Sequence, residues 1–419
     1  MRQSQLFTKT LKEAPKDEVS LNAQFLLRAG FIHKEMAGVY SVMPLGFKVI
    51  NKIKKIVAEE MKDIGSEEFI MSTLQNKEVW EKTDRWDDKK VDIWFKSELK
   101  NGNQVGFGWS HEEPIVDLMK SYITSYNDLP RFVHQFQNKL RNETRAKSGV
   151  IRCREFIMKD MYAFCGSDEE NMEFYNKSTE AYLKVFKRIG LGDITYVTSA
   201  AGGVFTDKFS HEFQTLCESG EDLIYVHKDN NIAINKEIYN EETVKKMGLE
   251  MNDFEEKKAA EVGNIFNFGT SKCEQMDLYF SDKEGNRKPV YLSSYGIGIT
   301  RLMGVLVEVF HDDKGIIWPE AVAPFKKHLI VLGEDKEVVD AAEELYKKII
   351  DNSEEVLFDD RTNVTAGAKF ADADLIGIPQ RLIISKKTLA ENSVEVKERS
   401  SADSRLVPLT EMLAVVEGI

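Results

Sequence analysis

The chain has 419 residues and a formal net charge of −13, from 57 Lys and Arg against 70 Asp and Glu. Its 42% hydrophobic and 30% charged residues are typical of a globular protein with more than one domain, and no apolar run reaches the roughly 20 residues of a membrane span. The acidic balance argues against indiscriminate binding to nucleic acid, but it permits a nucleic-acid partner held by local basic patches.

The chain contains few cysteines, and their positions follow no metal-ligand or disulfide spacing: Cys153, Cys165, Cys217 and Cys273. We therefore expect neither a structural zinc nor a disulfide framework. A reduced, cytoplasmic setting fits this usage best. The first residues contain no hydrophobic signal core, and their acids argue against a transit peptide.

In chain order, the first strong pattern is that of a helix. Apolar residues at helical spacing predict it over 46–64, and the run EEFIMSTL over 67–74 then predicts a strand. Two further strand-like runs, 131–140 and 154–164, flank a basic stretch. We expect these two runs to form a hairpin with a long loop around Gly149.

The middle of the chain continues with a helix, an irregular segment and a strand followed by a helix. Ser167 and Glu170 match a capping box, which predicts a helix that ends near Ile189. Residues 229–262 are rich in Asn, Lys and Glu and predict a small excursion or linker. The run over 288–310 predicts a strand, a glycine turn and an apolar helix.

The pattern of predicted elements changes after Pro319 and Pro324, which mark a domain boundary. Beyond them, strand-like runs alternate with helical patterns over about 336–350 and 366–376. This alternation predicts a compact α/β unit over 326–419, separate from a larger domain over 1–325.

The loop of the predicted hairpin concentrates positive charge in an acidic chain. Because arginine offers a planar fork of donors, Arg141 could hold the α-phosphate of a nucleotide bound with Mg²⁺, and Arg152 could reach its terminal phosphates. Glu143 could accept from the adenine amino group or orient a neighbouring arginine. A solvated charged hairpin is the alternative, and it is favoured if this stretch is taken alone.

Two other stretches carry candidate chemistry. In YGIGITR (295–301), glycines such as Gly298 let a ligand approach the backbone and Arg301 could cap a γ-phosphate, although helix–sheet packing explains the pattern equally well. In GFGWSHEEP (106–114), Ser110 and Glu112 alternate on an extended chain and could hold a substrate ammonium. A helix N-cap is the alternative for that pair.

Together these stretches resemble, in order, the three motifs of class II aminoacyl-tRNA synthetases: a long helix and strand, an Arg-x-Glu hairpin, and a Gly-x-Gly-x-x-Arg strand and helix. The chain is similar to bacterial prolyl-tRNA synthetases over nearly its full length, on runs that include SHEEPIVDL, KLRNETRAKSGVIRCREFIMKDMYAF, YGIGITRLMG and GAKFADADLIGIP. The resemblance implies an α+β fold, with a catalytic antiparallel sheet flanked by helices and a C-terminal α/β anticodon-binding domain. It also implies a homodimer.

The activity implied by the resemblance is that of a proline–tRNA ligase. Proline and ATP with Mg²⁺ give prolyl-adenylate and pyrophosphate, and the prolyl group then passes to the terminal adenosine of tRNA(Pro). By position, the catalytic residues are Arg141 and Arg301. The proline-binding residues are Ser110, Glu112, Arg141 and His211, although a lone histidine such as His211 is more often structural. The ATP-binding residues are Arg141, Glu143, Arg152, Cys153, Gly298 and Arg301.

The C-terminal domain is itself acidic, so tRNA binding there must rest on local contacts rather than on bulk attraction. The candidates are Arg361, Lys369 and Arg381. A solvated surface charge is the alternative for each of them.

The chain departs from the family pattern at several places. Ser110 replaces a threonine, Ser72 replaces a proline and Cys165 replaces a histidine, the loop over 200–213 looks longer than usual, and the long editing insertion is absent. Three other functions stay open: another synthetase of the same subclass, a catalytically silent paralogue that binds tRNA, and an acyl-adenylate ligase with a different acceptor. The retained Arg141, Glu143 and Arg301 favour an enzyme.

Overall fold

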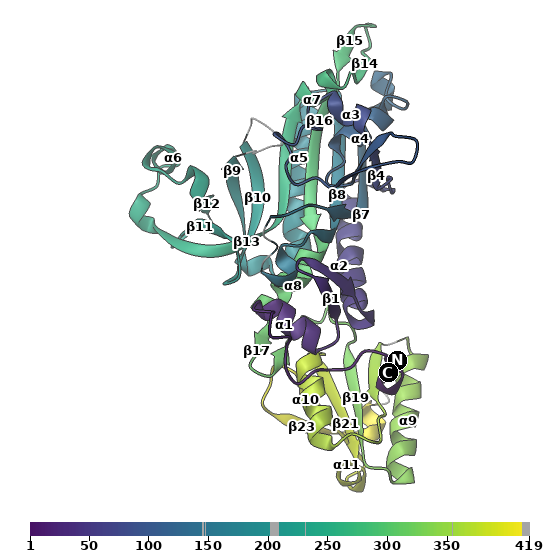
Figure 1. The fold of residues 1–419 in the computed structure, drawn as a ribbon. Coiled ribbons are helices and arrows are strands. Elements are labelled where there is room, and N and C mark those ends of the chain that lie inside the picture. Colours follow the sequence, from purple (N-terminus) through teal and green to yellow (C-terminus); the bar gives the residue numbers. More distant parts are fainter. Residues whose placement is uncertain (145, 147, 202–208, 231, 354, 413–419) are drawn as a thin grey trace. The chain divides into compact units, whose positions relative to one another are not determined.

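A computed structural model describes the chain except for residues 145, 147, 202–208, 231, 354 and 413–419 (Figure 1). Residue contacts divide it into two units. The central unit comprises Met36–Val39 and Ile53–Val305, and the terminal unit comprises Met1–Glu35, Tyr40–Lys52 and Leu306–Ile419. The domain boundary expected at 325/326 stays a prediction.

A nine-stranded sheet forms the centre of the central unit, in the order β10-β9-β12-β11-β13-β16-β8-β7-β3, and β10 also pairs with β13. Neighbouring strands are antiparallel except for the pairs β12–β9 and β3–β7. The strands are β3 (Glu67–Glu68), β7 (Arg131–Leu140), β8 (Glu155–Cys165), β9 (Thr195–Ala201), β10 (Phe209–Leu216), β11 (Asp222–His227), β12 (Ala233–Asn235), β13 (Phe254–Gly269) and β16 (Tyr291–Gly298). The predicted antiparallel hairpin is therefore confirmed as β7 and β8.

Helix α5 (Asp168–Arg188) covers one face of this sheet (Figure 1). Aromatic side chains form contacts between the helix and the sheet. The ring of Phe174 stacks on Phe132 at 3.6 Å between centroids, and Tyr182 lies 4.9 Å from Phe213. The Ser167 side chain caps the helix by accepting from the backbone of Glu170. Only half of the predicted capping box forms, because the Glu170 carboxylate accepts from the backbone of Gly166 at 3.0 Å instead.

Helix α2 (Pro44–Asp63) confirms the helix predicted over 46–64. The strand predicted over 67–74 is wrong for most of its length, since only β3 and the start of β4 (Leu74–Asn76) lie within it. Glutamine side chains explain the difference. The backbone N–H of Met71 donates to Gln135 Oε1 at 2.9 Å, and Gln137 Nε2 donates to the carbonyl of Met71 at 2.6 Å.

The sequence predicts a small excursion or linker over 229–262, and the structure shows that this segment has secondary structure. It contains β12, η5 (Lys236–Ile238), α6 (Glu241–Lys246), η6 (Met251–Asp253) and the first half of β13. These elements form an arm with β11 (Figure 1), and the arm has its own small apolar cluster around the buried Ile234, Val244 and Phe254. The apolar residues of this cluster are few and lie within a polar sequence. Composition alone therefore indicated only a small excursion or linker.

The strand and helix predicted over 288–310 are β16 and α8 (Ile299–Val309). No separate turn stands between them, because Gly296 and Gly298 are the last residues of the strand itself. The sequence analysis expects an unusually long loop over 200–213. Residues 202–208 of this loop lie outside the described residues.

The remaining elements are short. They are η1 (Gln3–Gln5), α1 (Leu21–Arg28), β1 (Ile32–Met36), β2 (Val39–Val42), α3 (Lys77–Glu81), β5 (Lys96–Glu98), β6 (Gln104–Phe107), α4 (Glu112–Met119), η2 (Tyr126–Asp128), η3 (Gly149–Ile151), η4 (Gly192–Ile194), α7 (Ser271–Gln275), β14 (Tyr279–Ser281), β15 (Arg287–Pro289), β17 (His311–Asp312) and β18 (Gly315–Ile316). In the described part of the chain, no helix is both long enough and apolar enough to span a membrane.

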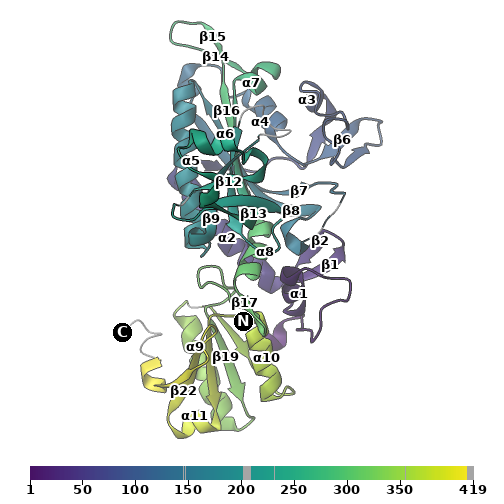
Figure 2. The same cartoon turned by 90° about the vertical axis from the view of Figure 1, so that its left-hand side faces the viewer.

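The terminal unit contains the predicted α/β alternation, in a five-stranded sheet of order β20-β19-β21-β22-β23. Its elements are β19 (Lys327–Leu332), α9 (Lys336–Asp351), β20 (Val356–Asp359), α10 (Ala366–Ile376), β21 (Gln380–Ser385), α11 (Lys386–Ala390), β22 (Ser393–Glu398) and β23 (Ser404–Pro408). Strands β20, β19 and β21 are parallel, and α9 and α10 lie on opposite sides of β19 (Figure 2). Both predicted helices are confirmed, whereas α11 and β23 were not predicted.

Substitutions at two glycines, one within α10 and one directly after its last residue, test the packing of the terminal unit. Gly377 ends the helix at φ +80°, and a Cβ there would approach the carbonyl oxygen of Ile316 to 2.2 Å. We expect Gly377→Ala to lower the free energy of unfolding by about 1–3 kcal/mol, because it adds backbone strain and a clash. Gly367→Ala in the same helix is the matched control, since a Cβ there meets no described atom within 4 Å. Thermal unfolding of both variants is the measurement, and equal melting temperatures would contradict this account.

Candidate active site

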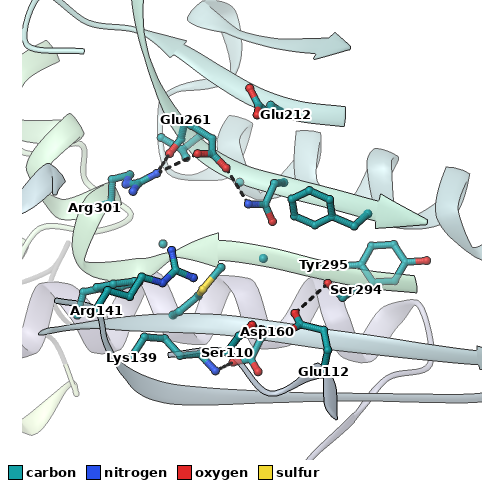
Figure 3. Close-up of a pocket in the computed structure, with 18 of the residues that line it drawn as sticks. Ser110, Glu112, Lys139, Arg141, Asp160, Glu212, Glu261, Ser294, Tyr295 and Arg301 are labelled. Carbon is teal, nitrogen blue, oxygen red and sulfur yellow. Dashed lines mark hydrogen bonds and ion pairs between the residues drawn. The ribbon is translucent and has the colours of Figure 1, made fainter. Parts of the chain in front are cut away.

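One face of the central sheet forms the floor of a pocket of about 420 Å³ (Figure 3). Side chains on one strand point to this face at every second residue. Strand β8 contributes Phe156, Met158 and Asp160, and β16 contributes Ser294, Gly296 and Gly298. The strand register places Gly298 beside Met158 and Gly296 beside Asp160, so the two rows form one continuous surface.

Ser110 and Glu112 meet at one end of this pocket. They do not lie on an extended chain as predicted, because Glu112 is the first residue of α4. The Ser110 hydroxyl donates to Glu112 Oε2, and the Ser294 hydroxyl lies 3.5 Å from Glu112 Oε1. This end of the pocket therefore presents a carboxylate that is flanked by two hydroxyl groups.

A buried ammonium group underlies the middle of the pocket. Lys139 Nζ lies 2.9 Å from Asp160 Oδ1 and 2.6 Å from His111 Nδ1. Burial lowers the pKa of Lys139, while Asp160 opposes that shift. Burial and the Lys139 charge together lower the pKa of His111 to about 3, so that its imidazole is neutral and Nδ1 accepts from Lys139.

Two guanidinium groups face the other end of the pocket. Arg141 Nε donates to the carbonyl of Trp109 at 3.3 Å, and its guanidinium lies 5.3 Å from the ring centroid of Phe156. Arg301 Nε donates to the carbonyl of Ile151 at 2.8 Å. Burial and the positive charge of Arg301 lower the pKa of Arg141. An anion between the two arginines would relieve this repulsion.

The pocket thus brings together five of the predicted site residues: Ser110, Glu112, Arg141, Gly298 and Arg301. Four others are described but do not line it: Glu143, Arg152, Cys153 and His211. Arg152 pairs with Glu143 at 2.8 Å and with Glu221 at 2.6 Å. The loop residues Arg145 and Lys147 lie outside the described residues.

The other two residues outside the pocket are buried or half-buried. The Cys153 thiol lies 3.7 Å from the carbonyl of Gly149, within hydrogen-bonding range for sulfur. His211 Nδ1 lies 2.7 Å from the hydroxyl of Tyr175, and burial lowers the pKa of His211. Their assigned ligand contacts stay predictions.

Sequence reasoning missed several residues that line the pocket. They are Lys139, Phe156, Asp160, Glu212, Glu261, Asn264, Ser294 and Tyr295. Alternation along the predicted strands could have found Phe156 and Asp160. Glu261 was missed because it lies in the polar segment 229–262, for which the sequence predicts only a small excursion or linker.

Two of the missed residues give the pocket wall a carboxyl pair. Burial and the charge of Glu261 raise the pKa of Glu212 to about 8. Burial and the charge of Asp222 raise the pKa of Glu261, although Arg301, 3.6 Å away, opposes that shift. The carboxyl groups are therefore short of cationic partners.

The three anticodon candidates do not form one cluster. Arg361 and Lys369 both surround Asp359 at the carboxyl end of β20, where Arg361 lies 2.7 Å from its carboxylate and Lys369 Nζ donates to backbone carbonyls. Arg381 instead pairs with Asp374 at 3.0 Å, at the start of β21 and the opposite end of the sheet. Only 3% of Lys369 is exposed, so it contributes to the packing of the unit and is not a solvated charge.

Comparisons with known proteins match both parts of the chain. Residues 94–310 match the tRNA synthetase class II core domain (G, H, P, S and T), and residues 321–419 match an anticodon binding domain. The fold is similar to that of prolyl-tRNA synthetases from Giardia lamblia (TM-score 0.76, 18% identity, 93% of this chain and 74% of that one) and Cryptosporidium parvum (TM-score 0.78, 16% identity, 95% and 76%). The fold is that of a class II aminoacyl-tRNA synthetase, as the sequence predicted.

Curated relatives identify the family more closely. The proline–tRNA ligase of Agrobacterium fabrum is 37% identical over 435 residues, which cover 98% of each chain, and that of Wolbachia pipientis is 36% identical over 424 residues, which cover 99% of each. The chain belongs to the proline–tRNA ligase family. Because the alignments cover nearly all of these relatives, they too have no room for a long insertion.

The depressed pKa of His111 predicts a pH-dependent stability. A histidine in an unfolded chain has a pKa of about 6.5, so between this value and about 3 the unfolded chain binds a proton that the folded chain does not. Stability is then lost as the pH falls through this window. We expect the slope of unfolding free energy against pH to be smaller in His111→Gln, by up to about 1.4 kcal/mol per pH unit. Urea unfolding at several pH values is the measurement, and equal slopes would contradict the buried neutral imidazole.

Proposed function

We propose that this chain activates proline with ATP and transfers the prolyl group to tRNA(Pro). The observation that carries the proposal is the polarity of the pocket, with a carboxylate at one end and two arginines at the other. Proline has a cationic nitrogen, and its carboxylate must meet the α-phosphate of ATP. The named activity of the curated relatives supports proline over the other amino acids of the subclass.

In this proposal Glu112 and Ser110 hold the proline nitrogen. The nitrogen of the zwitterion carries two hydrogens and a positive charge, which match the acceptor set of a carboxylate and a hydroxyl. Arg141 then lies at the junction, where it can bind both the proline carboxylate and the α-phosphate.

The ATP half of the pocket is assigned to Arg301, Gly298 and the hairpin loop. Arg301 would bind the γ-phosphate, and Gly298 leaves room for a ligand near the backbone. The pairing of Arg152 with Glu143 supports the second of the two roles considered for Glu143, that of orienting an arginine. Arg152 is partly exposed and could exchange this carboxylate for phosphate.

The first chemical step needs no general base. The proline carboxylate is already ionised, so its oxygen attacks the α-phosphorus as the bond to pyrophosphate breaks. Positioning of the two reactants supplies one part of the catalysis, and stabilisation of phosphate charge by Arg141 and Arg301 supplies the other. In the second step a hydroxyl of the terminal adenosine attacks the prolyl carbonyl, and AMP leaves.

Magnesium is proposed to enter with ATP. Within the described residues, no group of three or more His, Cys, Asp and Glu side chains could hold a metal ion by itself. Glu212 and Glu261 nevertheless fit a cation that is bound mainly by phosphate oxygens, because they offer hard oxygen donors. Burial and neighbouring carboxylates raise the pKa values of both groups, and a bound cation would lower them. Bound there, the ion would neutralise charge on the leaving phosphates.

The terminal unit is proposed to select tRNA(Pro), since an anticodon binding domain matches residues 321–419. Arg361 is the strongest candidate contact, because its guanidinium is partly exposed beside Asp359 and Asp372. A homodimer and a cytoplasmic location are proposed with the function. The four buried cysteine thiols are consistent with a reduced compartment.

Arg141 gives the most direct test of this assignment. Proline should drive exchange of pyrophosphate into ATP far better than any other amino acid. Arg141→Ala should raise the activation free energy of the chemical step by on the order of 3–4 kcal/mol. Arg131→Ala is the matched control, because Arg131 is an exposed arginine at the opposite end of β7. A preference for threonine or serine would overturn the substrate. A loss of less than about tenfold in Arg141→Ala would remove that residue from the reaction.

A second test separates tRNA selection from chemistry. Arg361→Ala should raise the tRNA(Pro) concentration needed for half-maximal charging, because a contact to the anticodon loop is lost, while proline-dependent pyrophosphate exchange stays nearly unchanged. Lys369 is left intact, since its burial makes unfolding a risk. The same charging measurement on Arg381→Ala shows whether the opposite end of the sheet contributes to tRNA(Pro) binding. If Arg361→Ala charged tRNA(Pro) as the wild type does, Arg361 would not be an anticodon contact.

A further inference from the structure

A second layer of charge lies directly behind the Ser110–Glu112 end of the pocket. Glu113, the residue after Glu112, is fully buried. Its carboxylate accepts from Arg85 Nη1 at 2.9 and 3.0 Å, from Lys272 Nζ at 2.7 Å and from the Thr83 hydroxyl at 2.9 Å. Four donor contacts from three residues thus converge on one carboxylate.

The same layer extends to Glu112. Arg85 Nη1 lies 3.7 Å from Glu112 Oε2, so one nitrogen stands between the two neighbouring carboxylates. The guanidinium also lies 4.6 Å from the ring centroid of Trp109 and 5.4 Å from that of Trp80, both of which are buried. These aromatic faces restrict how far the arginine can move.

This layer contains more positive charge than the Glu113 carboxylate can balance. Glu113 takes one positive charge, yet two cations, Arg85 and Lys272, are buried with it. Although burial raises the pKa of Glu113, Arg85 and Lys272 outweigh burial and hold that pKa at about 2. Among the described residues, Glu112 is the other carboxylate in ion-pair contact with these two cations, and Arg85 makes that contact.

We propose that Arg85 is a positioning residue for proline binding, which holds the Glu112 carboxylate oriented toward the pocket from behind. Arg85 does not line the pocket and would not touch the substrate. The inference rests on the proposed function, in which Glu112 binds the proline nitrogen. Lys139 is already engaged by Asp160 and His111, and among the described residues Arg85 is the cation in ion-pair contact with Glu112.

A double-mutant cycle between Arg85 and Glu112 tests the proposal. Arg85→Gln should raise the KM for proline about tenfold or more, and in the Glu112→Gln background the same change should have an effect of about threefold or less. The KM for ATP should stay near that of the wild type in Arg85→Gln. A purely structural role would instead change both KM values together and would act equally in both backgrounds, and either outcome overturns the proposal.

Two further variants keep the test decisive. Arg85→Lys retains the charge and should fold even if Arg85→Gln does not. Because an ammonium cannot reach both carboxylates as a guanidinium does, its KM for proline should be raised by a smaller factor, and a wild-type value would contradict the proposal. Lys159→Met is the matched control. It removes a fully buried amino group that donates to the Tyr182 hydroxyl and the Tyr295 carbonyl and does not contact Glu112, and it should reduce stability without a selective effect on proline.

The Glu112→Gln variant separates this inference from the proposed function. If Glu112→Gln leaves the KM for proline unchanged, the placement of the proline nitrogen is wrong. If Glu112→Gln raises that KM and Arg85→Gln and Arg85→Lys do not, only the role of Arg85 is wrong.

Discussion

Burial of charge beneath the pocket is the constraint on which the rest of the site depends. Lys139 and Asp160 form an ion pair on neighbouring strands, and the same lysine fixes the hydrogen-bonding state of His111. Removing one member of such a pair leaves an uncompensated buried charge, which is strongly destabilising. The pair therefore ties the sheet to the turn that carries Ser110 and Glu112. The floor at the Ser110–Glu112 end of the pocket therefore cannot rearrange without separating these charges.

The same principle explains how an acidic protein can serve an anionic substrate. Arg152 of the basic hairpin is already matched by Glu143 and Glu221. Arg141, at the start of the hairpin loop, and Arg301, in α8, face the pocket and repel one another there. A net charge of −13 is thus compatible with phosphate binding, since the relevant potential is set within the pocket and not by the sum over the chain.

Sequence reasoning reached the fold and the main motifs but not the wall of the pocket. The hairpin, the strand and helix around Gly298 and the two C-terminal helices have strong periodicity, and each was predicted. The strand over 67–74 failed because side chains of Gln135 and Gln137 hold that backbone, a tertiary contact that no local pattern reveals. Glu261 was not predicted as a pocket residue because β13 begins in a polar segment. Arg85, Glu113 and Lys272 lie far apart in sequence, and only folding brings them together.

The central claim is that Glu112 and Arg141 bind opposite ends of the amino-acid part of one adenylate. A crystal structure with a sulfamoyl analogue of prolyl-adenylate, in which a sulfamoyl group replaces the phosphate, tests it most directly. The account predicts that the proline nitrogen lies within hydrogen-bonding distance of the Glu112 carboxylate and that the sulfamoyl oxygens contact Arg141. A proline nitrogen that pointed away from Glu112, or a sulfamoyl group out of reach of Arg141, would contradict it.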